Sequence, residues 1–169
     1  MEGSVILKTV TVLLTKYSDF ISSVVYHIGG RGYTHSSISL EGDDNYYSFN
    51  YHGFCIETID KHKQRGVENS IAFELLISDE HYNKIKSRIT EIQLNCKEYS
   101  YTRIGLVFAI LKVPFQWRKH YFCSQFIAEL LKEYGGIPLK KESYQYLPNH
   151  FRHELNSFCF LNRIIYNPI

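Results

Sequence analysis

Apolar residues along this 169-residue chain follow two periods, one typical of strands and one typical of helices. Short β-branched and aromatic stretches bounded by turn residues predict strands at residues 5–14, 36–40, 46–51, 71–77 and 158–165. Apolar residues three and four positions apart predict helices at residues 18–26, 78–94, 102–111 and 123–134, with one helical turn at 143–147 and a loop at 52–70. The chain has no repeat, low-complexity tract or linker, so the pattern predicts a single α+β domain over residues 1–169.

Two of the predicted strands form a β-hairpin whose faces differ in polarity. With the tip of the turn at residues 43–44, Ser48 lies opposite Ser39 and Asn50 lies opposite Ser37. Side chains alternate between the two faces of a strand. One face of the hairpin then carries Ile38, Leu40, Tyr47 and Phe49. The other face carries His35, Ser37, Ser39, Ser48 and Asn50.

Composition and charge argue against several classes of protein. The net charge is only +2 and the Lys and Arg residues are scattered, so no basic face for nucleic acid is expected. The longest apolar run, residues 104–115, contains Lys112 and Pro114 and is too short to span a bilayer. We therefore expect a core helix there and no stable membrane insertion.

The cysteines and the N-terminal sequence bear on the compartment. The N-terminus has neither the basic region nor the small-residue cleavage site of a secretory signal. The four cysteines show no Cys-x-x-Cys spacing, so we expect reduced thiols and a cytoplasmic location. No glycine-rich nucleotide motif is present, and no cofactor is expected.

Cys123 stands at the start of the last long predicted helix. Apolar residues at positions 126, 127, 130, 131 and 134 define the buried side of that helix. Cys123 shares this side because it lies three positions before Phe126 and four before Ile127. The free N–H groups and the dipole at a helix start favour a thiolate. A cysteine nucleophile also needs a nearby imidazole, and His35 on the polar hairpin face is the candidate.

Two sequence segments, taken in this order, resemble a known superfamily. The first is Tyr33-Thr34-His35-Ser36-Ser37-Ile38, and the second is Tyr121-Phe122-Cys123-Ser124-Gln125-Phe126. The arrangement resembles the circularly permuted papain-like proteins of the NlpC-type superfamily, which includes YiiX-like amidases and lecithin retinol acyltransferase-like enzymes. The resemblance covers most of the chain and implies an antiparallel sheet packed against helices, with the nucleophile at a helix N-terminus.

The same resemblance assigns roles to residues. It implies Cys123 as the nucleophile and His35 as general base and then acid, with a third residue that orients the imidazole. Ser48 matches the place of that third residue, and Asn50 on the same face is an alternative. Many relatives carry Glu or His at that place, and Glu57 is a further candidate in the predicted loop. The oxyanion donors would be the Cys123 N–H and a side chain such as that of Gln116, which is otherwise read as a solvated loop residue.

Three functions follow as hypotheses. The first is a cysteine-dependent hydrolase (an amidase or peptidase) or an acyltransferase, which forms an acyl-thioester on Cys123 from a small peptide, an amide or a lipid ester. The second is a non-catalytic binding module that retains the papain-like cleft, because Ser48 stands where relatives carry Glu or His. The third is a structural zinc site formed by His150, His153 and Cys159, a poor ligand set that leaves no metal as the expectation. The sequence does not indicate the oligomeric state.

Overall fold

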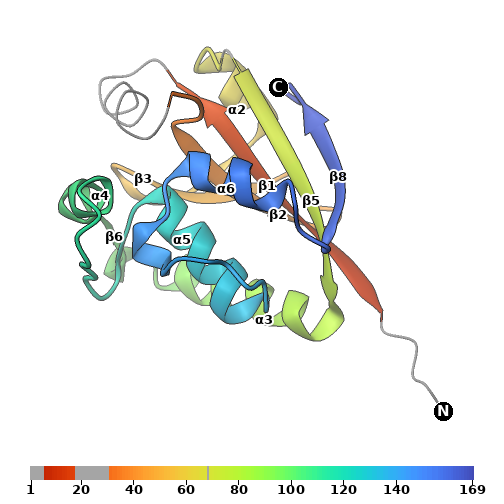
Figure 1. The fold of residues 1–169 in the computed structure, drawn as a ribbon. Helices are drawn as coiled ribbons and strands as arrows, with labels where there is room; N and C mark the ends of the chain where they lie inside the picture. Colours follow the sequence, from red (N-terminus) through yellow and green to blue (C-terminus); the bar gives the residue numbers. More distant parts are fainter. Residues whose placement is uncertain (1–5, 18–30, 68) are drawn as a thin grey trace.

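A six-stranded antiparallel sheet forms the centre of the computed structural model, which describes residues 6–17, 31–67 and 69–169 (Figure 1). The strands lie in the order β4-β3-β2-β1-β5-β8. Their bounds are β1 Leu7–Lys16, β2 His35–Leu40, β3 Tyr46–Asn50, β4 Gly53–Glu57, β5 Asn69–Ser78 and β8 Leu161–Tyr166. The predicted α+β class is confirmed, and the helix predicted at residues 18–26 falls outside the described residues.

Helices pack against the apolar face of this sheet. Helix α3 (Asp79–Leu94) begins where the Ser78 hydroxyl accepts a hydrogen bond from the His81 N–H, as a helix cap does. Helix α5 (Cys123–Glu129) continues as a π-helical turn, η2 (Leu130–Tyr134). The other elements are α2 Ile59–Gln64, α4 Arg103–Ile110, α6 Pro148–Leu155, the 3-10 turns η1 Cys96–Glu98 and η3 Ser143–Gln145, and a parallel pair β6 Ser100–Tyr101 and β7 His120–Tyr121.

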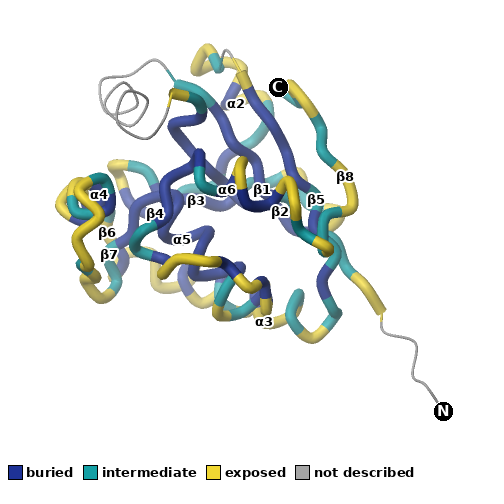
Figure 2. Tube along the Cα trace, in the orientation of Figure 1, coloured by how far each residue is buried: buried dark blue, intermediate teal, exposed yellow. Residues whose placement is uncertain are grey.

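The main hydrophobic core lies between the sheet and helices α3 and α5. Val10, Val12 and Phe73 alternate toward the core from the central strands, and all three are fully buried. The ring of Phe126 on α5 meets that of Phe49 on β3 edge to face, with centroids 5.1 Å apart. Figure 2 shows the buried chain concentrated in the sheet and α5. This packing fixes the N-terminal end of α5 beside β2 and β3.

The segment predicted as a loop at residues 52–70 instead contains β4 and α2. Strand β4 pairs with β3 through a two-residue turn, and Gly53 after that turn has a φ of +106°, which favours glycine. Thr58 then caps α2 by accepting a hydrogen bond from the Lys61 N–H. The prediction was wrong because strand β4 is short and depends on its partner β3.

The register of the β2–β3 hairpin also differs from the prediction. Ile38 pairs with Tyr47, which moves β3 by two residues relative to the predicted register. The reason is the turn, because the Asp43 N–H donates to the Leu40 carbonyl and Gly42 has a φ of +72°. The turn therefore lies one residue earlier than predicted. A shift of two residues leaves each side chain on its predicted face.

Helix α4 is buried on one side and exposed to solvent on the other. Its inner side is buried as predicted, but Ile104 and Val107 on its outer side are each 53% exposed. None of the helices in the described residues is long and apolar enough to cross a lipid bilayer.

Candidate active site

The structure brings Cys123 and His35 together at the N-terminal end of α5. Cys123 is the first residue of that helix, and its thiol hydrogen-bonds with the imidazole of His35, the first residue of β2. The backbone N–H groups of Ser36 and Ser124 also donate to the sulfur. Cys123 and His35 are each 8% exposed, so the pair lies just beneath the surface.

Glu57 lies behind the imidazole, at the end of β4. Its Oε2 atom is 2.8 Å from Nε2 of His35. Its other oxygen, Oε1, accepts a hydrogen bond of 2.8 Å from the Arg65 guanidinium, just past α2. The Glu57 side chain is only 1% exposed. A buried carboxylate is stable when it is paired and hydrogen-bonded, and both of its oxygens here meet a nitrogen donor.

The electrostatics of the three groups favour a charged pair. Burial lowers the pKa of His35, but the charge of Glu57 and the hydrogen bonds with Cys123 and Glu57 raise that pKa to about 10. Burial raises the pKa of the Cys123 thiol, but the hydrogen bond and charge of His35 and the two N–H groups bring it below its ordinary value. Burial raises the pKa of Glu57, and the charge and hydrogen bond of His35 lower it to about 2. At neutral pH the site therefore favours thiolate, imidazolium and carboxylate.

A second histidine supports Glu57 from the other side. His62 on α2 is fully buried, and its Nδ1 hydrogen-bonds with the Tyr17 hydroxyl. Its Nε2 faces Oε2 of Glu57 at 3.8 Å and has no hydrogen-bond partner among the described residues. Burial lowers the pKa of His62 to about 4, so the ring is neutral at pH 7. We assign the ring proton to Nε2, because an N–H facing the carboxylate is favourable and a lone pair is not.

Ser48, the residue expected behind the imidazole, has another role. Its hydroxyl donates to the Ser36 carbonyl at 2.7 Å, across the gap between β3 and β2. The Ser36 N–H meets the Cys123 sulfur, so Ser36 uses both backbone groups at this point. The group next to His35 is Glu57, because β4 adds a further strand that carries it to the polar face.

Asn50 and Gln116, the other expected residues, lie elsewhere. The Asn50 side chain accepts a hydrogen bond from the His52 N–H at 2.9 Å and so stabilises the β3–β4 turn. Gln116 lies exposed in the segment between α4 and β7. It lines a hollow of about 570 Å³ with Trp117 and Gln125, and Cys123 does not line that hollow. A donor for an oxyanion is instead available in the Cys123 N–H, which starts the first turn of α5.

The sequence carried one signal for Glu57 that the prediction did not use. Phe54-Cys55-Ile56-Glu57 has strand-forming residues and ends in a carboxylate just before the Thr58 helix cap. An acidic residue at the end of a strand, close in sequence to His35, is a candidate partner for the imidazole. Recognising this requires knowing that the segment is a strand of the same sheet.

The residues proposed for zinc are not arranged as ligands. Among the described residues no group of three or more His, Cys, Asp or Glu is placed to hold a metal ion. Nδ1 of His150 accepts a hydrogen bond from the Leu147 N–H at 3.1 Å, at the start of α6, and Cys159 lies exposed. The zinc hypothesis therefore receives no support from these side chains.

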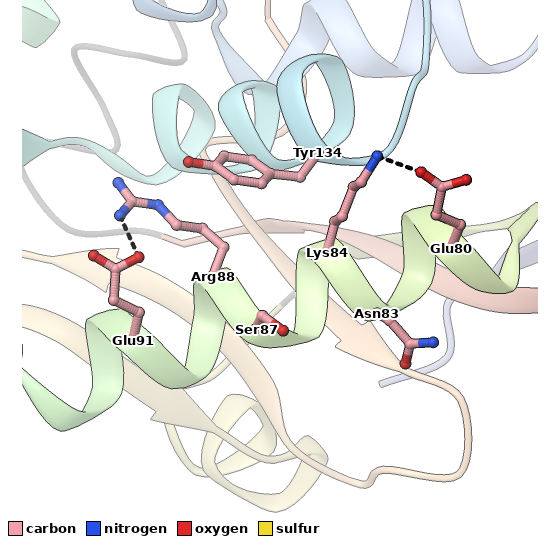
Figure 3. Close-up of a pocket in the computed structure, with 7 residues that line it drawn as sticks. All are labelled: Glu80, Asn83, Lys84, Ser87, Arg88, Glu91 and Tyr134. Carbon is pink, nitrogen blue, oxygen red and sulfur yellow. Dashed lines mark hydrogen bonds and ion pairs between the residues drawn. The ribbon is translucent and has the colours of Figure 1, made fainter.

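Another hollow, of about 510 Å³, lies along α3 beneath Tyr134 (Figure 3). Its charged side chains are paired with one another, Lys84 with Glu80 at 2.6 Å and Arg88 with Glu91 at 3.0 Å. The figure shows these side chains on the same helix, with the Tyr134 ring between Arg88 and Lys84. Paired charges at a surface are typical of a solvated helix, and we assign no chemistry to this hollow.

No protein-family model matches this chain, and neither does any curated protein. Its function is therefore inferred from the chemistry of the site.

Proposed function

We propose that this chain is a cysteine-dependent hydrolase or acyltransferase that works through an acyl-thioester on Cys123. The observation that carries the proposal is the buried line of Cys123, His35 and Glu57, with the thiol at a helix N-terminus and the carboxylate 2.8 Å from the imidazole. A nucleophile, a base and a group that orients the base are the parts that acyl transfer by cysteine needs.

The roles follow from the positions of the atoms. The Cys123 thiolate attacks the carbonyl carbon of an amide or ester, and a carbon–sulfur bond forms while the carbonyl oxygen becomes an oxyanion. The N–H groups at the start of α5 stabilise that charge. The His35 imidazolium gives its proton to the leaving nitrogen or oxygen, and the bond from carbon to the leaving group breaks.

The second half of the reaction restores the enzyme. Water, or another acceptor in a transferase, gives a proton to neutral His35 as it attacks the thioester carbon. The carbon–sulfur bond then breaks and the thiolate leaves. Glu57 holds its hydrogen bond to Nε2 throughout, which leaves Nδ1 for the sulfur and for the proton.

The fold assignment is part of the same proposal. We propose a circularly permuted papain-like domain, in which His35 and Glu57 precede the cysteine along the chain. Support comes from the antiparallel sheet packed against helices and from Cys123 as the first residue of α5. The reason for a non-catalytic module was the missing Glu or His in the place of Ser48, and Glu57 supplies a carboxylate to the ring instead.

The four cysteines are all free thiols, which suits a reducing compartment, and we propose a cytoplasmic location.

The test is direct detection of the acyl-enzyme. The chain is incubated with p-nitrophenyl acetate, and intact-mass spectrometry with peptide mapping follows the acetyl group. We expect a burst of nitrophenolate and an acetyl group on Cys123, with neither in Cys123→Ala. Cys55→Ala is the matched control, because Cys55 is a half-buried thiol on β4, two residues from Glu57, and it should behave as the wild type. Acetylation only at other residues, or an unchanged burst in Cys123→Ala, would contradict the proposal.

A further inference from the structure

The outer side of helix α4 is apolar although it faces solvent. Ile104, Val107 and Leu111 follow at helical spacing and are 53%, 53% and 62% exposed. The opposite side of the helix is also apolar, with Leu106 and Ala109 buried in a small core of their own. A helix that is apolar all round is expected to be covered on both sides, whereas α4 is covered on one.

The segment that follows α4 extends this outer side. Val113 is 42% exposed and Trp117 is 48% exposed, and a stack of Phe108 on Phe115 with centroids 4.7 Å apart ties the segment back to the helix. Residues 104–117 hold five of the ten exposed large apolar side chains of the described chain. The remaining five lie elsewhere in the chain, so half of these exposed apolar side chains belong to α4 and the segment after it, and Figure 1 shows α4 at one end of the molecule. We call Ile104, Val107, Leu111, Val113 and Trp117 the α4 surface.

Within the segment that carries the α4 surface, every Lys, Arg, Asp or Glu is basic. Residues 103–120 contain four basic residues and no Asp or Glu. Arg103, Lys112 and Arg118 are exposed, and Lys119 is paired with Glu98.

We propose that the α4 surface docks on an anionic lipid bilayer, with its apolar side chains in the interface and the surrounding cations on the lipid headgroups. Apolar side chains with a tryptophan and a rim of Lys and Arg are the combination that binds such a surface. A second copy of the chain fits less well. A symmetric dimer would place the same patch on itself and bring Arg103, Lys112 and Arg118 of both copies together, and residues 103–120 contain no Asp or Glu to pair with them. The docking does not depend on the chemistry of Cys123.

The chain offers its own probe for this contact, because Trp117 is its single tryptophan. The full-length chain is titrated with vesicles of phosphatidylcholine alone and of phosphatidylcholine mixed with phosphatidylserine. We expect a blue shift of Trp117 emission and co-flotation with the mixed vesicles, both weakened by added salt. Cys123→Ala should bind equally well, so that a failure of the proposed enzyme and a failure of docking can be told apart.

Matched variants test whether the apolar side chains of the α4 surface contribute to membrane binding. Leu111→Asp and Val107→Asp should each weaken binding to mixed vesicles about tenfold or more. Leu94→Asp is the control, because Leu94 is 79% exposed but lies at the end of α3, and it should leave binding unchanged. Circular dichroism and the melting temperature confirm that each variant is folded. Equal losses in Leu94→Asp and Leu111→Asp would overturn the proposal.

Two double variants test whether the cations around the α4 surface contribute to binding of anionic vesicles. The double variant Lys112→Gln with Arg118→Gln should reduce the preference for anionic vesicles, and Lys63→Gln with Lys86→Gln should not. Light scattering measures the mass of the chain without lipid. If the wild type binds neither kind of vesicle, the proposal fails. If the chain is a dimer that Leu111→Asp converts to a monomer, the α4 surface belongs to a second copy and the proposal is overturned as well.

Discussion

Two thiols near the same carboxylate, the buried Cys123 and the half-buried Cys55, have opposite electrostatic surroundings. Cys55 lies on β4, two residues before Glu57, and burial followed by the charge of Glu57 raises the pKa of its thiol. Cys123 lies at the start of α5, where the imidazole of His35 stands between the sulfur and Glu57 and brings the pKa of that thiol below its ordinary value. Burial alone makes a thiol inert. The cation and the two N–H donors make the difference.

The first prediction is that alkylation separates the two thiols completely. With limiting iodoacetamide at pH 6, Cys123 should be labelled first and Cys55 last. An ordinary thiol with a pKa of about 8.5 is less than about 1% thiolate at pH 6, so Cys123 should react at least about tenfold faster even though a less basic thiolate is a weaker nucleophile. Peptide mapping by mass spectrometry gives the order. Labelling of Cys55, Cys96 or Cys159 before Cys123 would contradict a lowered pKa of the Cys123 thiol.

The second prediction concerns His35, whose loss should make Cys123 resemble Cys55. In His35→Ala the thiol keeps its burial and its N–H donors but loses the cation, so its pKa should rise and its alkylation at pH 6 should become slow. Turnover of an ester substrate should fall by roughly 10³-fold or more, because general acid and base are both removed. Stopped-flow alkylation against pH and kcat/KM provide the two readings. His52→Ala in the exposed β3–β4 turn is the control, and an equal loss there would mean that folding was disturbed.

The third prediction concerns Glu57, which acts on Cys123 through His35. Glu57→Gln keeps the shape of the side chain but removes the charge that raises the pKa of His35. The alkylation profile of Cys123 should therefore move to higher pH, and kcat should fall by about 10²-fold, less than in His35→Ala. Glu74→Gln on β5 removes a carboxylate that pairs with Arg163 away from the site, and it should leave both readings unchanged. A Glu57→Gln enzyme with the wild-type profile would show that the carboxylate does not tune the pair.

The same substitution should change the acid stability of the fold. The pKa of Glu57 is lowered to about 2 from an ordinary value of 4.5, so its charge contributes stability above about pH 4.5 that is lost as the pH falls toward 2. In the wild type this loss should be on the order of 2 kcal/mol in the free energy of unfolding. Urea unfolding between pH 6 and pH 2.5 should show a smaller loss in Glu57→Gln. Parallel pH curves for the two proteins would mean that Glu57 has an ordinary pKa in the fold.

The two ends of the site differ in how far the sequence could predict them. Cys123 carries a local signal, since the spacing of apolar residues after it fixes both the helix start and the buried side. His35 is local in the same way, at the start of a strand with one polar face. Glu57 is not local, because its place beside His35 depends on β4 pairing with β3 and on β3 lying next to β2. Those pairings follow from the Gly42 and Gly53 turns, and the sequence pattern placed one turn a residue late and missed the other.

The remaining difference between prediction and structure concerns surfaces. The apolar spacing of residues 102–111 predicted a helix correctly but also predicted that it is buried in the core. Spacing identifies which side chains share a face, but it does not say whether another element of the fold covers that face. Helix α4 has its small core on one side, and no other described element buries Ile104, Val107 or Leu111.

The smallest expected effect is that of Ser48, the residue that the sequence placed behind the imidazole. Ser48→Ala removes a hydroxyl that donates to the Ser36 carbonyl at 2.7 Å, and the loss of this buried bond should cost about 1–2 kcal/mol of the free energy of unfolding. Because the Ser36 N–H contacts the Cys123 sulfur, the alkylation rate should fall slightly, by less than about tenfold. Ser39→Ala is the matched control, since the Ser39 hydroxyl donates to the Asp43 carbonyl at 2.7 Å near the end of the neighbouring strand β2, away from Cys123. It should cost similar stability and leave alkylation unchanged. If Ser48→Ala instead lowers kcat far more than Glu57→Gln does, Ser48 rather than Glu57 orients His35, and the contrast between Cys123 and Cys55 then needs another cause.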